Sequence, residues 1–271
     1  MVEAPQSFVV REECEKAAWQ NGFRRVLAEV EGWAGFGSTT AQGTIWLAAA
    51  GIHGPWFLAL DHPGVEAELG LISTAITGPG ISRHAFETLG QLYAVLPRLY
   101  QLAASLPDAP LNVFQEKTAN LPKSTEAERL VVQRIGQDIF RAGLMDYWQG
   151  RCPLTGITDP ALLRASHIVP WAHCDNDAER LNVHNGLLLS ALWDAAFDQG
   201  LVTFNDDGEP LFSPTLSEQA RSRLGWQEPL PLTDQHRIRL AKHRAAVFDR
   251  RQDAEFSRLT DHPTLPPQKD E

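Results

Sequence analysis

The stretch that decides the fold runs from residue 152 to residue 208 and reads CPLTGITDPALLRASHIVPWAHCDNDAERLNVHNGLLLSALWDAAFDQGLVTFNDDG. His167 closes a short apolar segment, and a polar loop rich in Asp, Asn and His follows it. Next come His184, Asn185 and Gly186, and then an apolar run at 187–189. Residues 191–199 have the spacing of a short helix. This order predicts two strands joined by a polar loop and followed by one helix.

The predicted helix carries two carboxylates on one face. Asp194 and Asp198 are four residues apart, which places them on the same side of a helix. Trp193 and Phe197 have the same spacing on a neighbouring face, which we expect to pack on the strands. Burial of the rings would aim both carboxylates along the edge of the strand layer. The strand histidine, the loop asparagine and a helix carboxylate can then converge on one point.

Such a group suits hydrolysis of a phosphodiester with a hard divalent cation. A neutral imidazole can take a proton from water near pH 7. Carboxylate and amide oxygens are ligands that Mg²⁺ accepts, and a bound cation stabilises charge on the phosphate and on the leaving oxygen.

Several segments together resemble a known family. They are TEAERLVVQRIGQDIFRAGLMDYWQGRCPLTG at 125–156, ASHIVPW at 165–171, HNGLLL at 184–189, DAAFDQGLVTF at 194–204 and RLAKHRAAVF at 239–248. In this order they resemble the HNH endonucleases, which have the ββα-metal fold, and more closely the HNH domains of bacterial restriction endonucleases. The resemblance covers roughly residues 124–250.

The resemblance implies roles for three residues. His167 matches the first motif histidine and would be the general base that activates water. Asn185 matches the motif asparagine, which orients the catalytic loop and in some members touches the metal. Asp194 stands where the family has a metal-binding helix histidine. A carboxylate there would bias the site toward Mg²⁺ or Mn²⁺ as a single divalent cofactor.

The sequence departs from the family at two places. Ser166 stands before the base, where many members have a carboxylate or histidine, so Asp198, His184 or solvent would complete the metal ligands. Only Cys152 remains of the cysteine pairs that hold a structural zinc in many members, so we expect no structural zinc. Helices at 125–149 and 234–251 would then hold the motif by packing.

Each candidate residue also has a plain structural alternative. His167 could be a core histidine, and Asn185 could be a turn residue before Gly186. Asp194 could be a solvated helix residue, and Asp198 a residue at the helix end without a ligand role.

Outward from the motif, we expect an α+β protein of two domains. Residues 1–106 would form a mixed α+β domain, with short strands at 44–49 and 55–60, and a helical period at 86–103 that Pro97 interrupts. The segment 107–123 contains three prolines and is interpreted as a linker. Residues 124–252 would form the nuclease domain, and 253–271 a disordered tail.

Basic side chains near the motif are candidates for contact with DNA phosphates. A capping-box pattern, Thr125 with Glu128, predicts one helix start, and a second helix is expected from 233–234 to about 251. The phosphate-binding candidates are Arg164, Arg237, Arg239, Lys242 and Arg244. Residues 171–215 carry 1 basic and 8 acidic side chains, whereas 216–252 carry 8 and 4. An acidic centre beside basic segments suits a metal site beside a phosphate-binding surface, although ordinary charge scatter gives the same numbers.

Composition limits the remaining choices. The chain has 271 residues, of which 43% are hydrophobic and 21% charged, which excludes a largely disordered chain. No apolar run reaches the roughly 18 residues that a membrane span needs. The first residues lack a signal-peptide pattern, and the three cysteines form no C-x-x-C pair. We therefore expect a cytoplasmic protein without a membrane partner. The net charge of −10 taken alone argues against a nucleic-acid partner.

The N-terminal domain would supply sequence choice, because a nuclease that contacts mainly phosphates has little of its own. Its tryptophans, Trp19, Trp33, Trp46 and Trp56, could stack on a base, or they could be core residues. The interpretation is a metal-dependent restriction-type endonuclease that cuts double-stranded DNA, with or without base modification, as a monomer or homodimer. One alternative is an HNH fold that has lost catalysis and only binds nucleic acid. Another is a nuclease recruited by a protein partner through the N-terminal domain.

Overall fold

The computed structural model describes residues 1–122 and 124–249. The described residues form two compact units: residues 1–149 with 180–183, and residues 150–179 with 184–249. The protein is of mixed α+β class, as the sequence predicts. Among the described residues, no helix combines the length and the apolar character that a membrane crossing requires.

The N-terminal unit is built on one antiparallel sheet whose strands follow the chain order β1-β2-β3-β4-β5. The strands are β1 (Arg25–Val26), β2 (Ala34–Gly37), β3 (Thr44–Ala49), β4 (Trp56–Leu60) and β5 (Ser82–Phe86). The expected strands at 44–49 and 55–60 are therefore confirmed, with one residue's difference. All five side chains of β4 are buried, so the centre of the unit's core lies on this strand.

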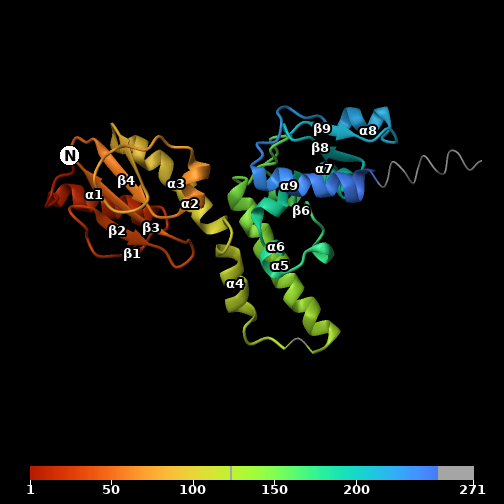
Figure 1. The fold of residues 1–271 in the computed structure, drawn as a ribbon, viewed down its shortest axis with the longest axis horizontal. Helices are drawn as coiled ribbons and strands as arrows, with labels where there is room; N and C mark the ends of the chain where they lie inside the picture. Colours follow the sequence, from red (N-terminus) through yellow and green to blue (C-terminus); the bar gives the residue numbers. More distant parts are fainter. Residues whose placement is uncertain (123, 250–271) are drawn as a thin grey trace, which may run out of the picture. The chain divides into compact units, whose positions relative to one another are not determined.

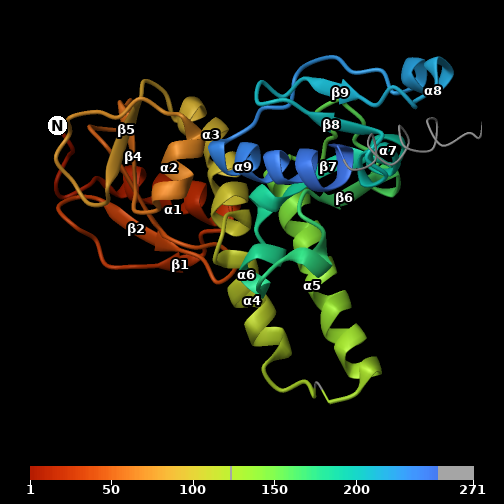
Figure 2. The ribbon, with the colours of Figure 1, turned by 45° about the vertical axis from the view of Figure 1, so that its right-hand side comes forward.

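Helices accompany this sheet in the N-terminal unit: α1 (Phe8–Gln20), α2 (Pro63–Leu69), α3 (Leu89–Ser105), α4 (Ala109–Thr118) and α5 (Glu126–Tyr147). Figures 1 and 2 show α1, α2 and α3 beside the strands. Helix α3 continues through Pro97, which faces solvent, while leucines at helical spacing are buried on the other side. The capping box of Thr125 and Glu128 starts α5, as predicted.

The segment interpreted as a linker, 107–123, differs from that interpretation. It contains α4, because Pro110 lies in the first turn, where its missing N–H costs nothing. Helix α5 belongs to the N-terminal compact unit, whereas the sequence assigned it to the nuclease domain.

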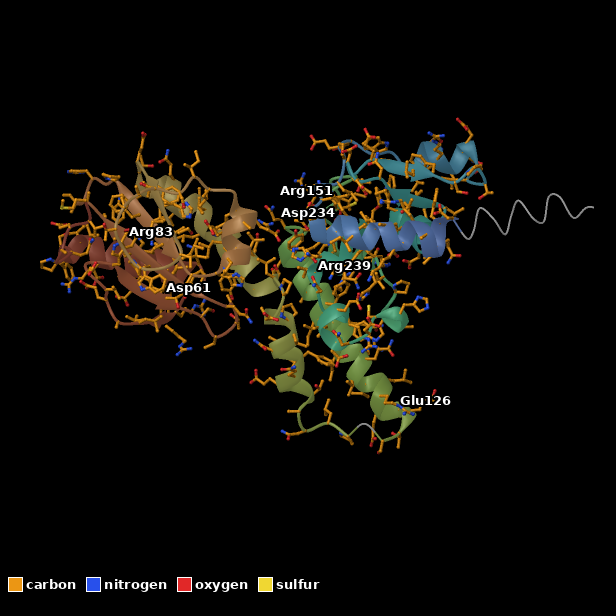
Figure 3. All side chains as sticks on the ribbon, in the orientation of Figure 1. Asp61, Arg83, Glu126, Arg151, Asp234 and Arg239 are labelled. Carbon is orange, nitrogen blue, oxygen red and sulfur yellow. The ribbon has the colours of Figure 1, made fainter. Side chains whose placement is uncertain are left out.

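Two side chains fasten the sheet of this unit at its turns, and Figure 3 labels both. The Arg83 guanidinium donates to the carbonyl oxygens of Gly78, Pro79 and Gly80, at 3.0–3.2 Å. The Asp61 carboxylate accepts the Thr44 amide at 2.6 Å, where β3 begins beside the end of β4. The Asp61 contact joins the end of β4 to the start of β3, and the Arg83 contacts hold the loop that precedes β5.

The tryptophans of this unit have different environments. Trp33 is 1% exposed and Trp56 is 3% exposed, so both are core residues. Trp46 is half-buried. Trp19 is 54% exposed, on the last turn of α1. Of the four, only Trp19 has a largely accessible ring.

The C-terminal unit contains two small antiparallel sheets. Strand β6 (Leu163–His167) pairs with β7 (Gly186–Ser190), and β8 (Val202–Phe204) pairs with β9 (Pro210–Phe212). Helix α7 (Ala191–Asp198) directly follows β7. The other helices are α6 (Asp177–Arg180), α8 (Glu218–Arg223) and α9 (Asp234–His243), with short 3-10 turns at Pro160–Leu162, Trp171–His173 and Val183–Asn185. The predicted strand, loop, strand and helix are therefore present in order.

The helix expected from 233–234 to about 251 is shorter than predicted as a regular α-helix. Helix α9 ends at His243 and passes into a π-helical turn, η4 (Arg244–Phe248). In both ribbon views α9 runs alongside the β8–β9 hairpin (Figures 1 and 2). The predicted end of this helix near residue 251 and the predicted disordered tail at 253–271 lie outside the described residues.

Candidate active site

Helix α7 is fixed by its aromatic face. Trp193 and Phe197 are 1% and 0% exposed, and both rings pack against Phe204 of β8, with centroids 5.9 and 5.8 Å apart. The helix also packs on β6 and β7. The predicted division of α7 into a buried aromatic face and a carboxylate face is therefore found, with β8 as an additional partner.

The carboxylate face of α7 meets strand β6 at Ser166. The Ser166 hydroxyl, which is buried, donates a short hydrogen bond to Asp194 Oδ1. His167 is the next residue along the strand and is half-buried. Adjacent strand residues leave the backbone on opposite sides, so Asp194 and the His167 ring approach the end of β6 from two directions.

Asp198 lies one turn beyond Asp194, at the end of α7. Partial burial of its carboxyl and the neighbouring Asp194 carboxylate raise the pKa of Asp198 to about 6. Two carboxylates that repel each other in this way form a site that a cation would stabilise.

Asn185 is fully buried, and its side chain binds the loop that follows β6. The Val169 amide donates to Asn185 Oδ1 at 2.8 Å, and Asn185 Nδ2 donates to the Val169 carbonyl at 3.2 Å. Nδ2 also lies 3.3 Å from the Glu179 carbonyl and 3.4 Å from Cys174 Sγ. Because both ends of the amide are occupied by the loop, this geometry favours the role of loop organiser over that of metal ligand.

The loop held by Asn185 places an aromatic ring against the candidate base. Trp171 lies two residues after Val169, and its ring meets the His167 ring edge-on, with centroids 5.5 Å apart. The sequence does not predict this contact of Trp171. Its signal was weak, because the only hint was its position just after the apolar end of β6.

The phosphate-binding candidates on α9 and η4 lie on two sides of the helix. Arg237 donates to the Asp206 carbonyl at 2.9 Å, and Arg244 binds the Asp206 carboxylate at 2.7 Å and the Phe204 carbonyl at 2.6 Å. Both arginines thus tie the helical segment to the β8–β9 hairpin. Arg237 also pairs with Asp234 at 2.8 Å.

The other basic candidates lie on α9 and on β6. Lys242 is exposed and lies 3.9 Å from a Glu179 carboxylate oxygen. Burial lowers the pKa of the Arg239 guanidinium, which Glu179 opposes, and Figure 3 labels this residue on α9. Arg164 is exposed on β6, and its guanidinium donates to the Ala161 and Leu163 carbonyls at 2.9 and 3.0 Å.

Two histidines of α9 face the core of this unit and were not recognised from the sequence. His236 and His243 are 0% and 3% exposed, with Leu240 between them. The His243 ring stacks on Phe197 at 3.9 Å between centroids, and His236 meets His184 edge-on at 5.2 Å. The spacing of residues 236, 240 and 243 indicates one buried face of a helix. It was not recognised because most residues around it are basic.

The donor set at the end of β6 fits a hard cation. Asp194 and Asp198 offer carboxylate oxygens, and no cluster of three or more His, Cys, Asp or Glu suited to a metal occurs within residues 1–122 and 124–249. The three cysteines, Cys14, Cys152 and Cys174, are buried, and none of them forms a disulfide bond within the described residues. Two carboxylates are few protein ligands for an ion, and Mg²⁺ tolerates such a set because it keeps several waters and takes phosphate oxygens.

Comparison with known proteins agrees with this geometry. Residues 152–205 match the family model described as HNH endonuclease. No curated protein matches the chain. The matched residues contain β6, β7, α7 and β8, and with them His167, Asn185 and Asp194. Residues 152–205 therefore form a domain of the HNH endonuclease family.

Proposed function

We propose that the C-terminal unit hydrolyses phosphodiester bonds of double-stranded DNA, with His167 as general base and one divalent cation, Mg²⁺ or Mn²⁺. The observation that carries the proposal is the hydrogen bond from Ser166 to Asp194. It holds the candidate ligand against Ser166, the strand residue directly before the candidate base His167, at the end of β6.

His167 would take the proton of the attacking water. An imidazole is suited to this task near neutral pH, because its ordinary pKa lies close to 7. The edge of Trp171 limits the rotation of the ring. Asn185 would act as a positioning residue. It holds Val169 and thereby the loop that carries Trp171, which in turn contacts His167.

Asp194 and Asp198 would hold the cation, as HNH nucleases generally use a divalent metal. When bound, it would supply Lewis-acid stabilisation of charge on the phosphate and on the leaving oxygen. The Ser166 hydroxyl occupies one oxygen of Asp194 and leaves the second oxygen for the ion.

Among the basic residues, Lys242 and Arg164 are the better candidates for phosphate contact, because both are exposed. Arg237 and Arg244 hold the hairpin, so we assign them a mainly structural role. Restriction-type specificity, choice of modified bases and a homodimer remain parts of this proposal that follow from the resemblance.

The test is cleavage of supercoiled plasmid in Mg²⁺ or Mn²⁺ by the full chain and by His167→Ala. We expect the wild type to nick or linearise the plasmid and the variant to lose at least about 100-fold in rate, the usual contribution of a general base. His53→Ala, an exposed histidine in the other unit, is the matched control and should cut at the wild-type rate.

Two outcomes would contradict the proposal. Retained cleavage by a folded His167→Ala variant would remove the base assignment. Metal-independent DNA binding without cleavage by the wild type would instead support an HNH fold that only binds nucleic acid.

A further inference from the structure

The N-terminal unit contains a large cavity that the proposed nuclease site does not use. It has a volume of about 580 Å³ and lies where α1 ends, beside the β2–β3 connection and α3. Polar residues from several elements line it: Gln20, Asn21, Arg24, Arg25, Thr39, Thr40, Tyr100, Gln101 and Asp146. The volume is within the range of small-ligand sites, about 300–1,000 Å³.

Two arginines give this cavity its charge. Arg24 and Arg25 are exposed, and neither guanidinium has an ion pair or hydrogen bond to another described residue. The Arg24 guanidinium lies over the exposed Trp19 ring, 5.7 Å from its centroid. This contact restrains Arg24 without neutralising it, so its donors stay available for an anion.

A second compartment adjoins the first and is mainly apolar. Its volume is about 360 Å³, and its apolar lining comes from α3, α4 and α5: Ala104, Pro110, Val113, Ile135, Ile139 and Ala142. The two compartments share Thr40, Tyr100 and Asp146. At their junction the Thr40 and Tyr100 hydroxyls form a hydrogen bond of 2.6 Å.

The side chains at the junction can recognise a planar polar group. Tyr100 offers an aromatic ring, and Asp146 and Gln101 offer an acceptor and an amide. A ligand that matches the whole cavity therefore has an anionic end for the arginines, a polar edge for the junction and a flat body for the apolar compartment.

We propose that this two-compartment cavity binds a nucleotide unit, with its phosphate at Arg24 and Arg25 and its base toward Ala104 and Ile139. Guanidinium groups bind phosphate through paired, charge-assisted hydrogen bonds. The unit could come from a free nucleotide or from a strand of nucleic acid, since both present the same phosphate, sugar and base. The proposal goes beyond the nuclease site, because every residue that it uses belongs to the N-terminal unit.

The test is calorimetric titration of the full chain without divalent metal. The probes are each of the four deoxynucleoside monophosphates, a deoxynucleoside, inorganic phosphate and a short single-stranded oligonucleotide. We expect saturable binding of a monophosphate or of the oligonucleotide, and binding at least tenfold weaker for the deoxynucleoside and for phosphate alone. Preference for the oligonucleotide assigns the site to a strand, and preference for the monophosphate assigns it to a free nucleotide.

Two variants examine the two compartments separately. Arg24→Ala with Arg25→Ala should weaken binding at least tenfold, and Ala104→Trp should do so by filling the apolar compartment. Arg11→Ala, an exposed arginine of α1 outside the cavity, should bind as the wild type does. Binding by none of the probes, or undiminished binding in both cavity variants, would overturn the proposal. Neither result would affect plasmid cleavage, which tests the other unit.

Discussion

At the residue scale, Ser166 orients the side chain of Asp194, the proposed metal ligand. A serine hydroxyl is a poor metal ligand, yet here it is buried and donates to Asp194. The bond fixes one carboxylate oxygen and so presents the other. Partners of this kind, which orient a ligand without touching the ion, typically change metal affinity or activity by about 10–100-fold when removed.

Ser166→Ala should therefore weaken Mn²⁺ binding about tenfold, because the Asp194 carboxylate would lose its fixed orientation. The measurement is titration of Mn²⁺ into the folded protein. Ser190→Ala is the matched control, since Ser190 is also buried but makes no capping hydrogen bond at the start of α7. Equal Mn²⁺ affinity in Ser166→Ala and the wild type would show that the bond does not serve the metal.

Asn185 supports a second prediction at the same scale. Replacing it by alanine would leave the Val169 amide without its partner and the Val169 carbonyl with only the weak Cys174 thiol donor. Because each buried unsatisfied group costs about 1–3 kcal/mol, Asn185→Ala should lower the free energy of unfolding by roughly 2–4 kcal/mol. Urea denaturation gives the value, with Asn112→Ala at an exposed position of α4 as control. A loss no larger than in the control would refute the organising role.

At the scale of elements, the sequence predicted those helices and strands whose bounds depend on hydrophobic periodicity and helix capping. Strands β3 and β4, the start of α5 and the aromatic face of α7 follow from local patterns, and all were found where expected. Helix α4 was not predicted because the three prolines of 107–123 indicated a linker, although only Pro110 lies within the helix, in its first turn. The contact between Ser166 and Asp194 could not be predicted, because it depends on how α7 packs on β6.

The positions of the arginines on α9 and η4 were also beyond the sequence. Their spacing shows only that they share a helical segment, whereas the fold of the β8–β9 hairpin places Asp206 beside two of them. Basic residues on one segment therefore divide into two sets, one that holds the hairpin and one that reaches solvent beside α6.

This division predicts different effects of Arg244→Ala and Lys242→Ala. Arg244→Ala should destabilise the unit by about 1–2 kcal/mol, because it loses the Phe204 carbonyl and the half-exposed Asp206 pair. Lys242→Ala should leave stability unchanged but lower the salt dependence of DNA binding by about one phosphate contact. Fluorescence anisotropy of labelled duplex DNA at several salt concentrations measures the second effect. If Arg244→Ala alone lowered the salt slope, the assignment would have to be reversed.

For the whole molecule, the net charge of −10 conceals local order. Residues 171–215, which include Asn185, Asp194 and Asp198, carry 1 basic and 8 acidic side chains, whereas 216–252 carry 8 basic and 4 acidic ones. The C-terminal unit also contains two buried histidines, His236 and His243, whose burial favours the neutral form of the ring. These two residues connect the stability of that unit to pH.

Burial lowers the pKa of His243 to about 4 and that of His236 to about 3. His184, Arg239 and Arg237 act in the same direction on His236, as Arg244 does on His243, whereas a hydrogen bond to the Phe197 backbone opposes it. In the unfolded chain both rings titrate near pH 6.5. Between these values the unfolded state binds more protons than the folded state, so stability falls as the pH falls from about 6.5 toward 4 and is unaffected above neutrality.

Each ring should contribute a slope of about 1.4 kcal/mol per pH unit over this window. Urea unfolding of the full chain at pH 7.5, 6 and 5 measures the combined slope. His243→Gln and His236→Gln should each remove one ring's share, because glutamine keeps a polar group but takes up no proton. His53→Gln, which is exposed, should retain the wild-type slope. If both buried-histidine variants kept that slope, the acid sensitivity would have to come from carboxylates, and the two histidines would be protonated at the same pH in both states.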